Sequence, residues 1–135
     1  MKKSSNKSEW SWSEDKLQMN VFVWFQNTYP KYHGLLFHVP NENQSGKRGK
    51  KMQFMGQVAG VADLLLMIDN PVAIELKRPD GTGSQSPAQK KWQKQWEDIG
   101  HLYVLMNDFE EIKTFISDRV SSYEWMQNQL NMGKN

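Results

Sequence analysis

Two acids and a lysine in this chain have a spacing that could serve phosphodiester hydrolysis. Asp63 closes the segment Gly60-Val61-Ala62-Asp63, and Glu75 and Lys77 lie two residues apart in Ile74-Glu75-Leu76-Lys77. Paired carboxylates can hold a divalent cation, which activates water, and a lysine can neutralise charge that develops on a phosphate. These residue types therefore predict a metal-dependent hydrolytic site, provided that the fold brings them together.

The elements expected to position these residues are two strands, over 62–68 and 72–77, separated by the turn-forming group 69–71. The run 64–68 is apolar at every position, which is typical of a central strand covered by helices on both faces. Charged residues inside such buried strands need a reason, because burying an unpaired charge is costly. An isolated Glu-x-Lys pattern, by contrast, is more often an ion pair at a strand edge.

Strand register decides whether the three side chains meet. Glu75 and Lys77 leave the same face of a strand because side chains alternate. If Ile68 pairs with Val72 across a three-residue loop, Asp63 lies opposite Lys77 and joins that face. A two-residue loop would turn Asp63 to the other face unless a bulge intervened.

The expected ligands of the cation are oxygens. Two neighbouring carboxylates raise each other's pKa unless a cation or a donor intervenes. Mg²⁺ suits Asp63, Glu75, the backbone carbonyl of Leu76 and waters, because it keeps several waters and uses few carboxylates. Lys77 would orient the attacking water or neutralise the pentavalent phosphorus transition state.

Composition narrows the remaining possibilities. The 135 residues predict one domain, with polar, flexible segments at 1–10 and 131–135. There is no cysteine, and the three histidines lack zinc-binding spacing, so thiol chemistry and zinc sites of this kind are excluded. The absence of a cleavable signal and of a long apolar run predicts a cytoplasmic protein with no membrane partner. The net charge of +2 excludes a strongly basic nucleic-acid coat.

The pattern of caps and apolar residues predicts the order α-β-β-β-α-β-α, an α/β fold with a mixed sheet flanked by helices. The first helix begins after Ser13, or after a capping box formed by Ser11 and Glu14. The other expected elements are a strand at 35–39, an exposed loop at 41–53, the strands at 62–68 and 72–77, a helix from Ser86 to near Gly100, a strand at 101–106 and a helix capped at Asp108.

Several motifs in this order resemble those of one nuclease family. They are Gly60-x-x-Asp63, Ile74-Glu75-Leu76-Lys77-Arg78-Pro79, Ser86-Pro87-x-Gln89 and Gly100-His101-x-Tyr103-Val104. The chain is similar over residues 11–118 to the VRR-NUC branch of the PD-(D/E)XK nuclease superfamily. The family's usual proline before the first acid is absent, and Val61-Ala62 stands there instead.

The resemblance implies a restriction-endonuclease-like α-β-β-β-α-β core with an extra C-terminal helix, within a single nuclease domain at 11–130. It also implies Mg²⁺- or Mn²⁺-dependent cleavage of DNA without an organic cofactor. The catalytic acids would be Asp63 and Glu75, and the catalytic lysine Lys77.

The resemblance extends to three further positions, each with a structural alternative. Glu14 matches an acid on the first helix that reaches the metal through water, but it could simply complete a capping box. Gln89 matches a glutamine of the helical motif, and it too stands at a capping-box position behind Ser86. Asn41 matches a position at the edge of the site, although a loop asparagine is usually a turn former.

Bare domains of this family resemble homodimeric Holliday-junction resolvases, often encoded by bacteriophages, which would place this protein in the host cytoplasm. Two sites related by a twofold axis could cut a branched DNA symmetrically. The residues expected to contact the DNA are Asn41, at the edge of the site, and the basic residues Lys47, Arg48, Lys50 and Lys51. The alternatives are a monomeric nicking or flap endonuclease and a catalytically silent DNA-binding module of the same fold.

Overall fold

A computed structural model describes residues 12–41 and 46–133. Its elements follow one another along the chain as α2 (Glu14–Thr28), the 3-10 helix η2 (Pro30–Tyr32), β1 (Leu36–His38), α3 (Gly46–Phe54), β2 (Leu64–Leu66), β3 (Val72–Leu76), α4 (Pro87–Asp98), β4 (Leu102–Met106) and α5 (Phe109–Met132). In the part of the chain described, no helix combines the length and apolarity that crossing a membrane requires.

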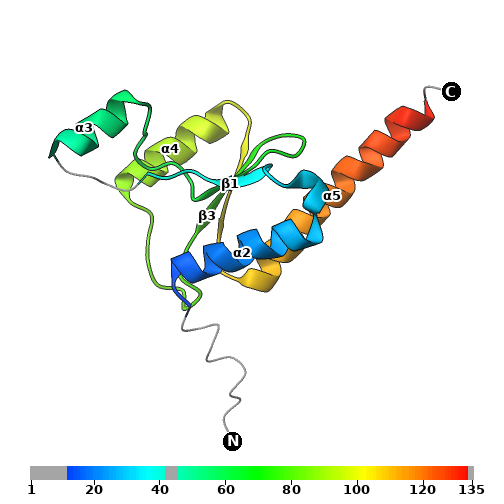
Figure 1. Ribbon diagram of the computed structural model, residues 1–135, viewed down its shortest axis with the longest axis horizontal. Helices are drawn as coiled ribbons and strands as arrows, with labels where there is room; N and C mark the ends of the chain where they lie inside the picture. Colours follow the sequence, from blue (N-terminus) through cyan, green and yellow to red (C-terminus); the bar gives the residue numbers. More distant parts are fainter. Residues whose placement is uncertain (1–11, 42–45, 134–135) are drawn as a thin grey trace, which may run out of the picture.

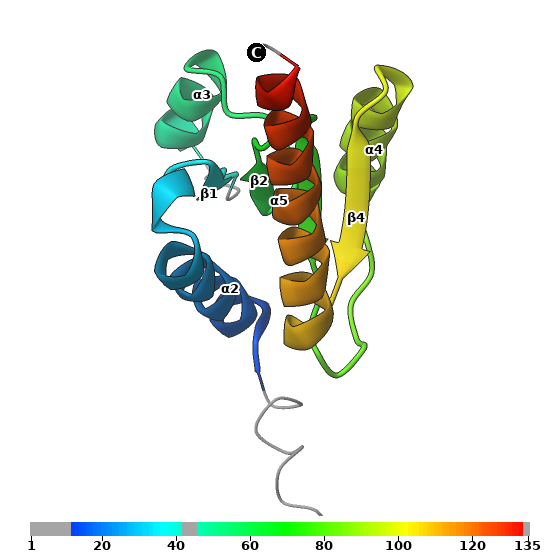
Figure 2. The same ribbon diagram turned by 90° about the vertical axis from the view of Figure 1, so that its right-hand side faces the viewer.

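The strands form one mixed sheet in the order β1-β2-β3-β4. β2 pairs antiparallel with β1 and with β3, whereas β3 and β4 are parallel. A parallel pair needs a crossover connection, which α4 provides. Helices α2 and α5 cover one face of the sheet and α4 covers the other (Figures 1 and 2). The expected α/β fold with a C-terminal helix is confirmed.

The two faces of β3 carry different side chains. Val72, Ile74 and Leu76 point into the larger core, which they share with apolar residues of α2 and α5. Ala73 points to the opposite face and joins a smaller cluster under α4. Because side chains alternate along a strand, the odd-numbered positions of β3 face α4. Glu75 therefore lies on the α4 side of the sheet.

Serine and aspartate caps set the helix starts. Ser13 Oγ accepts a hydrogen bond from the Lys16 amide at 3.1 Å, so Ser13 is the N-cap of α2. The alternative cap, Ser11, lies outside the described residues. Asp108 Oδ2 accepts from the Glu111 amide at 2.9 Å and caps α5. α5 then continues to Met132, beyond the domain boundary expected at residue 130.

The prediction of an exposed loop over 41–53 is wrong for residues 46–53, which belong to α3. Residues 42–45 lie outside the described part of the chain. α3 lacks an apolar stripe, and Gly49 is its only buried residue. The lysines, Arg48, Met52 and Gln53 nevertheless have high intrinsic helix propensity, and this outweighs the glycines. Periodicity alone misses a helix that packs so little.

The predicted three-residue turn between β2 and β3 is also wrong. Leu66, rather than Ile68, is the partner of Val72, so residues 67–71 form the connection. Asp69 adopts a left-handed conformation there, with φ of 58°. The register is displaced by two residues, and a displacement by an even number leaves every side chain on its expected face.

Candidate active site

The sheet gathers the two acids and the lysine on its α4 side, as the register argument expected. Asp63 directly precedes β2, Glu75 lies within β3 and Lys77 directly follows it. Asp63 Oδ2 accepts a hydrogen bond from the Leu76 amide at 2.8 Å, which holds the Asp63 carboxylate against β3. Lys77 Nζ lies 3.7 Å from Glu75 Oε1. The three charged groups form one cluster.

Glu75 is only 2% exposed, although it carries a carboxyl group. Gln89 Nε2 donates to its Oε1 at 2.9 Å, whereas Oε2 is buried and has no hydrogen-bond partner within the described residues. Burial raises the pKa of Glu75 to about 8; the nearby Asp63 charge adds to the rise and Lys77 opposes it. Oε2 gains a partner when Glu75 is protonated and donates to Asp63, and the raised pKa of Glu75 favours that protonated form when no cation is bound.

Lys77 is held by neutral oxygens. Its Nζ donates to Gln89 Oε1 at 3.3 Å and to the Ser84 carbonyl at 3.4 Å. Only 10% of its side chain is exposed. These contacts and the ion pair with Glu75 at 3.7 Å fix the positive charge of Lys77 beside the acids.

Gln89 unites the two roles that the sequence left open. Its amide and side chain complete a capping box with Ser86 at the start of α4. The same side chain donates through Nε2 to Glu75 and accepts through Oε1 from Lys77. The N-terminus of α4 thereby orients both an acid and the lysine.

Gly60 allows α4 to approach the segment before Asp63. It has φ of +86°, and a Cβ atom built on it would lie 2.2 Å from the Ala88 carbonyl oxygen. We expect Gly60→Ala to lower the free energy of unfolding by at least about 2 kcal/mol, since it adds a backbone clash to the cost of a left-handed residue. Chemical denaturation measures this change.

The matched control for that prediction is Gly34→Ala. Gly34 has φ of +93°, but its Cβ would meet nothing within 4 Å. This variant should show only the backbone cost, about 1 kcal/mol. Equal destabilisation by the two substitutions would mean that close packing of α4 does not require Gly60.

Glu14 lies near this cluster. It is half-buried at the first position of α2, and burial raises its pKa, with Asp63 adding to the rise and Lys77 opposing it. The Glu14 carboxyl is therefore within electrostatic reach of the site. Its action on a metal through water stays a prediction.

The expected DNA-binding residues lie on two separate elements. Asn41 Nδ2 donates to the Val61 carbonyl at 2.8 Å and fixes the segment that leads to Asp63. The exposed residues Lys47, Arg48, Lys50 and Lys51 all belong to α3. Their binding to DNA stays a prediction, but Asn41 already has a structural contact.

Sequence reasoning missed two neighbours of the acids. His38 Nδ1 lies 2.7 Å from the Asp63 carbonyl oxygen, so this ring nitrogen must carry the donated proton. Tyr103 is buried on the α4 side, and its burial, helped by the Glu75 charge, raises its pKa to about 12. Gln85 Nε2 donates to the Tyr103 hydroxyl at 3.0 Å. Tyr103 belongs to the motif Gly100-His101-x-Tyr103-Val104, which was the available signal, whereas the His38 contact has none in the sequence.

The donor set fits a cation with few protein ligands. Across residues 12–41 and 46–133, no group of three or more His, Cys, Asp and Glu side chains could hold a metal ion. The Asp63 and Glu75 pair instead offers two carboxylates, one with a buried oxygen that lacks a donor. Mg²⁺ typically uses one or two carboxylates and keeps several waters, so this pair is sufficient for it.

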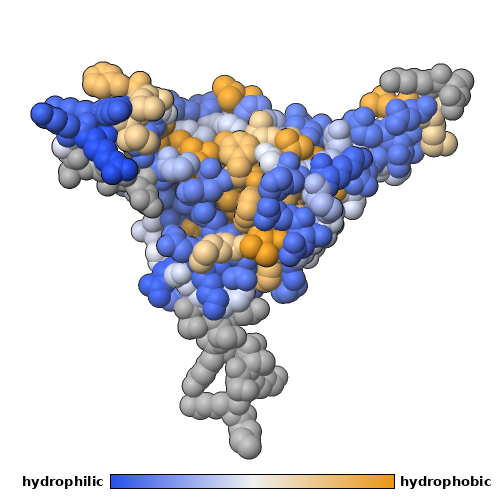
Figure 3. Space-filling model, in the orientation of Figure 1, coloured by the Kyte–Doolittle hydropathy of each residue, from blue (hydrophilic) through white to orange (hydrophobic). Residues whose placement is uncertain are grey.

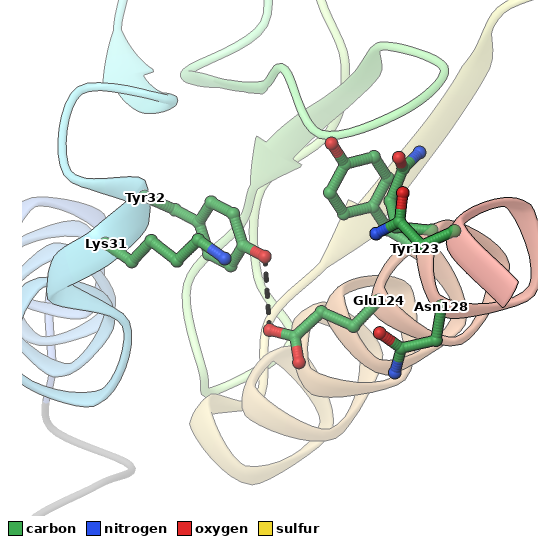
Figure 4. Close-up of a pocket in the computed structure, with 7 residues that line it drawn as sticks. Lys31, Tyr32, Tyr123, Glu124 and Asn128 are labelled. Atoms are coloured by element: carbon green, nitrogen blue, oxygen red, sulfur yellow. Dashed lines mark hydrogen bonds between the residues drawn. The ribbon is translucent and has the colours of Figure 1, made fainter. Parts of the chain in front are cut away.

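A separate cavity of about 330 Å³ lies between η2 and α5. In Figure 4, Tyr32 and Lys31 reach toward Glu124 and Asn128 of α5, and the Tyr32 hydroxyl donates to Glu124 at 3.1 Å. The residues lining this cavity include none of the clustered acids or Lys77. The cavity and the charged cluster are therefore different sites.

Comparison with known proteins supports the expected fold. No family model matches the sequence, and no curated protein matches it either. A solved structure described as a VRR_NUC domain protein superimposes with a TM-score of 0.66 and 24% identity, covering 82% of this chain and 90% of that one. Another, described as a VRR_NUC domain, has a TM-score of 0.47 and 17% identity, covering 75% and 95%. On the first of these similarities, the chain has the fold of a VRR_NUC domain.

Proposed function

We propose that this protein is an endonuclease that hydrolyses DNA phosphodiester bonds with Mg²⁺ or Mn²⁺. The observation that carries the proposal is Glu75, a buried carboxyl whose Oε2 has no donor within the described residues and whose pKa is raised to about 8 beside Asp63. Burying a carboxyl group in this way is costly, and such groups are concentrated at functional sites. A divalent cation would neutralise it, and the similarity in fold to a VRR_NUC domain protein supports the same interpretation.

In this proposal Asp63, Glu75 and the Leu76 carbonyl hold the cation. When bound, the cation would lower the pKa of a water and screen negative charge on the phosphate. Lys77, held by Gln89 and Ser84, supplies a fixed positive charge for the phosphorane transition state. Because these contacts exist before substrate arrives, little reorganisation is needed during reaction.

We further propose that the substrate is branched DNA and that the active form is a homodimer, as in a Holliday-junction resolvase. A domain this small has little surface for selecting a substrate, and twofold symmetry would supply two cuts at symmetric positions. The resemblance of the motifs to those of bare nuclease domains supports this finer assignment.

The test is incubation of the purified protein with a four-way junction, a flap and a plain duplex, with Mg²⁺ or with EDTA, alongside a measurement of mass in solution. We expect symmetric nicks in the junction by a dimer, only with Mg²⁺. Nicking of the flap by a monomer would support the monomeric alternative instead. If no substrate is cut and Asp63→Ala binds DNA as the unmodified protein does, the nuclease assignment is wrong.

A further inference from the structure

Helix α3 places cations and an aromatic ring on the same exposed face. Lys47, Lys50, Lys51 and Phe54 are spaced three, four and seven residues apart, so their side chains line one side of the helix. Phe54 is 91% exposed, although it is a large apolar residue. Exposing such a ring is costly unless it has a partner.

The apolar surface continues past the end of α3. Met55 is 71% exposed and Val58 is 52% exposed. We call residues 46–61, which include α3, the arm. No acidic residue occurs between positions 46 and 62, so no acid within the arm offsets its positive charge. Figure 3 shows strongly hydrophilic side chains at the α3 end of the molecule with hydrophobic ones beside them.

The arm is anchored beside the acidic cluster. Asn41 precedes α3 and Val61 follows it. The Asn41 side chain donates a hydrogen bond to the Val61 carbonyl, and this bond joins the chain on the two sides of α3, at the base of the arm. Val61 is two residues from Asp63. α3 extends from that base at the β1 side of the sheet (Figures 1 and 2). The segment that carries α3 is therefore tied at its base to the residues that lead directly to Asp63.

We propose that α3 binds both the bases and the phosphates of DNA. Phe54 stacks on an unpaired or unstacked base, while the lysines contact the adjoining phosphates. The proposal rests on the nuclease function above and assigns the preference for branched substrates to Phe54. Aromatic rings next to cationic side chains are the usual platform for exposed bases. Continuous duplex does not present a base face, whereas a branch point or a flap does.

The placement of charge favours DNA over a membrane. A helix that lies on a lipid surface puts its apolar residues on one face and its lysines on the other. In α3 the lysines and Phe54 share a face. Each nucleotide of a strand presents one phosphate and one base, so a face with both lysines and an aromatic ring can contact both groups.

The experiment measures affinity of the full chain for a flap, a four-way junction and a matched duplex across a series of salt concentrations with EDTA present. Phe54→Ala should weaken binding to the branched substrates by about 5- to 100-fold without changing the salt slope. Its effect on duplex should be less than twofold. Lys50→Ala should reduce the salt slope by about one for every substrate.

Two controls sharpen this test. Leu130→Ala removes a side chain that is 60% exposed at the far end of α5, and it should leave binding unchanged. Abasic nucleotides at the branch should lower the affinity of the unmodified protein to that of Phe54→Ala. Circular dichroism should show that all three variants keep their helices.

Other outcomes overturn the inference. If Phe54→Ala binds and cuts branched DNA as the unmodified protein does, the nuclease assignment survives and the stacking role does not. If Phe54→Ala instead changes mass in solution, or binding to vesicles containing anionic lipid, the ring serves a second copy or a membrane. If the unmodified protein neither binds nor cuts any DNA with Mg²⁺, the proposed function itself fails.

Discussion

Glu75→Gln is expected to reduce Mg²⁺-dependent cleavage by at least about 10³-fold while making the metal-free protein more stable at pH 8. The neutral amide keeps an oxygen for the bond from Gln89 Nε2 and gains an N–H group on the side of Asp63. The substitution also removes the negative charge of Glu75, which binding of a divalent cation requires. Single-turnover cleavage and chemical denaturation in EDTA measure the two effects.

The stability gain should depend on pH in a definite direction. The pKa of Glu75 rises from the ordinary value of 4.5 to about 8 on folding, so between these values the folded protein binds more protons than the unfolded chain. The contribution of Glu75 to the stability of the unmodified protein therefore falls as pH increases from 4.5 to 8. Glu75→Gln should remove this decrease and be roughly 2–4 kcal/mol more stable at pH 8, with little difference at pH 4.5.

The matched control is Glu110→Gln, which neutralises an acid whose side chain is 69% exposed in an ion pair with Lys113. We expect neither cleavage nor the pH dependence of stability to change with it. A Glu75→Gln protein that still cuts DNA, or that is destabilised at pH 8 in EDTA, would contradict the role assigned to the buried carboxyl.

Lys77→Met should lower the single-turnover rate of cleavage by about 10²- to 10³-fold, because it removes a preorganised positive charge from the phosphate. Methionine fills similar space, so the packing around α4 should be retained. Lys77 also lowers the pKa of Glu75, and its loss should raise that pKa further. Mn²⁺ binding, followed by electron paramagnetic resonance at a pH above 8, should persist.

Lys94→Met is the corresponding control, since Lys94 pairs with Asp98 on the exposed side of α4. It should cut DNA at the unmodified rate. Unchanged cleavage by Lys77→Met would show that Lys77 only maintains the fold, and loss of Mn²⁺ binding would assign it to the metal site rather than to the phosphate.

Local patterns were sufficient for most elements of the fold. Ser13, Ser86 and Asp108 act as helix caps where the sequence predicts them, because a cap depends on residues within one turn. Apolar periodicity failed at α3, whose stability owes little to a buried stripe. The strands are also shorter than their apolar runs, since β2 pairs only over Leu64–Leu66.

Some features of the candidate site follow from residues close together in the sequence, and others depend on how the strands pair. Glu75 and Lys77 share a face of the sheet by strand alternation alone, a property of any two residues spaced by two. Asp63 joins that face only if the loop between β2 and β3 has an odd number of residues, or if a bulge compensates. The sequence was compatible with loops of odd or even length. The longer connection at 67–71, with Asp69 in a left-handed conformation, decides that register in the structure.

The amino-acid sequence by itself identified the two acids and the lysine, the helix caps and the order of all the main elements except α3, because each of these depends on neighbours in the chain. Only the tertiary structure decided that α4 would place Gln89 between Glu75 and Lys77. It also decided that Glu75 would be buried and its pKa raised to about 8. Desolvation and charge proximity depend on groups distant in sequence, so no local pattern could reveal them.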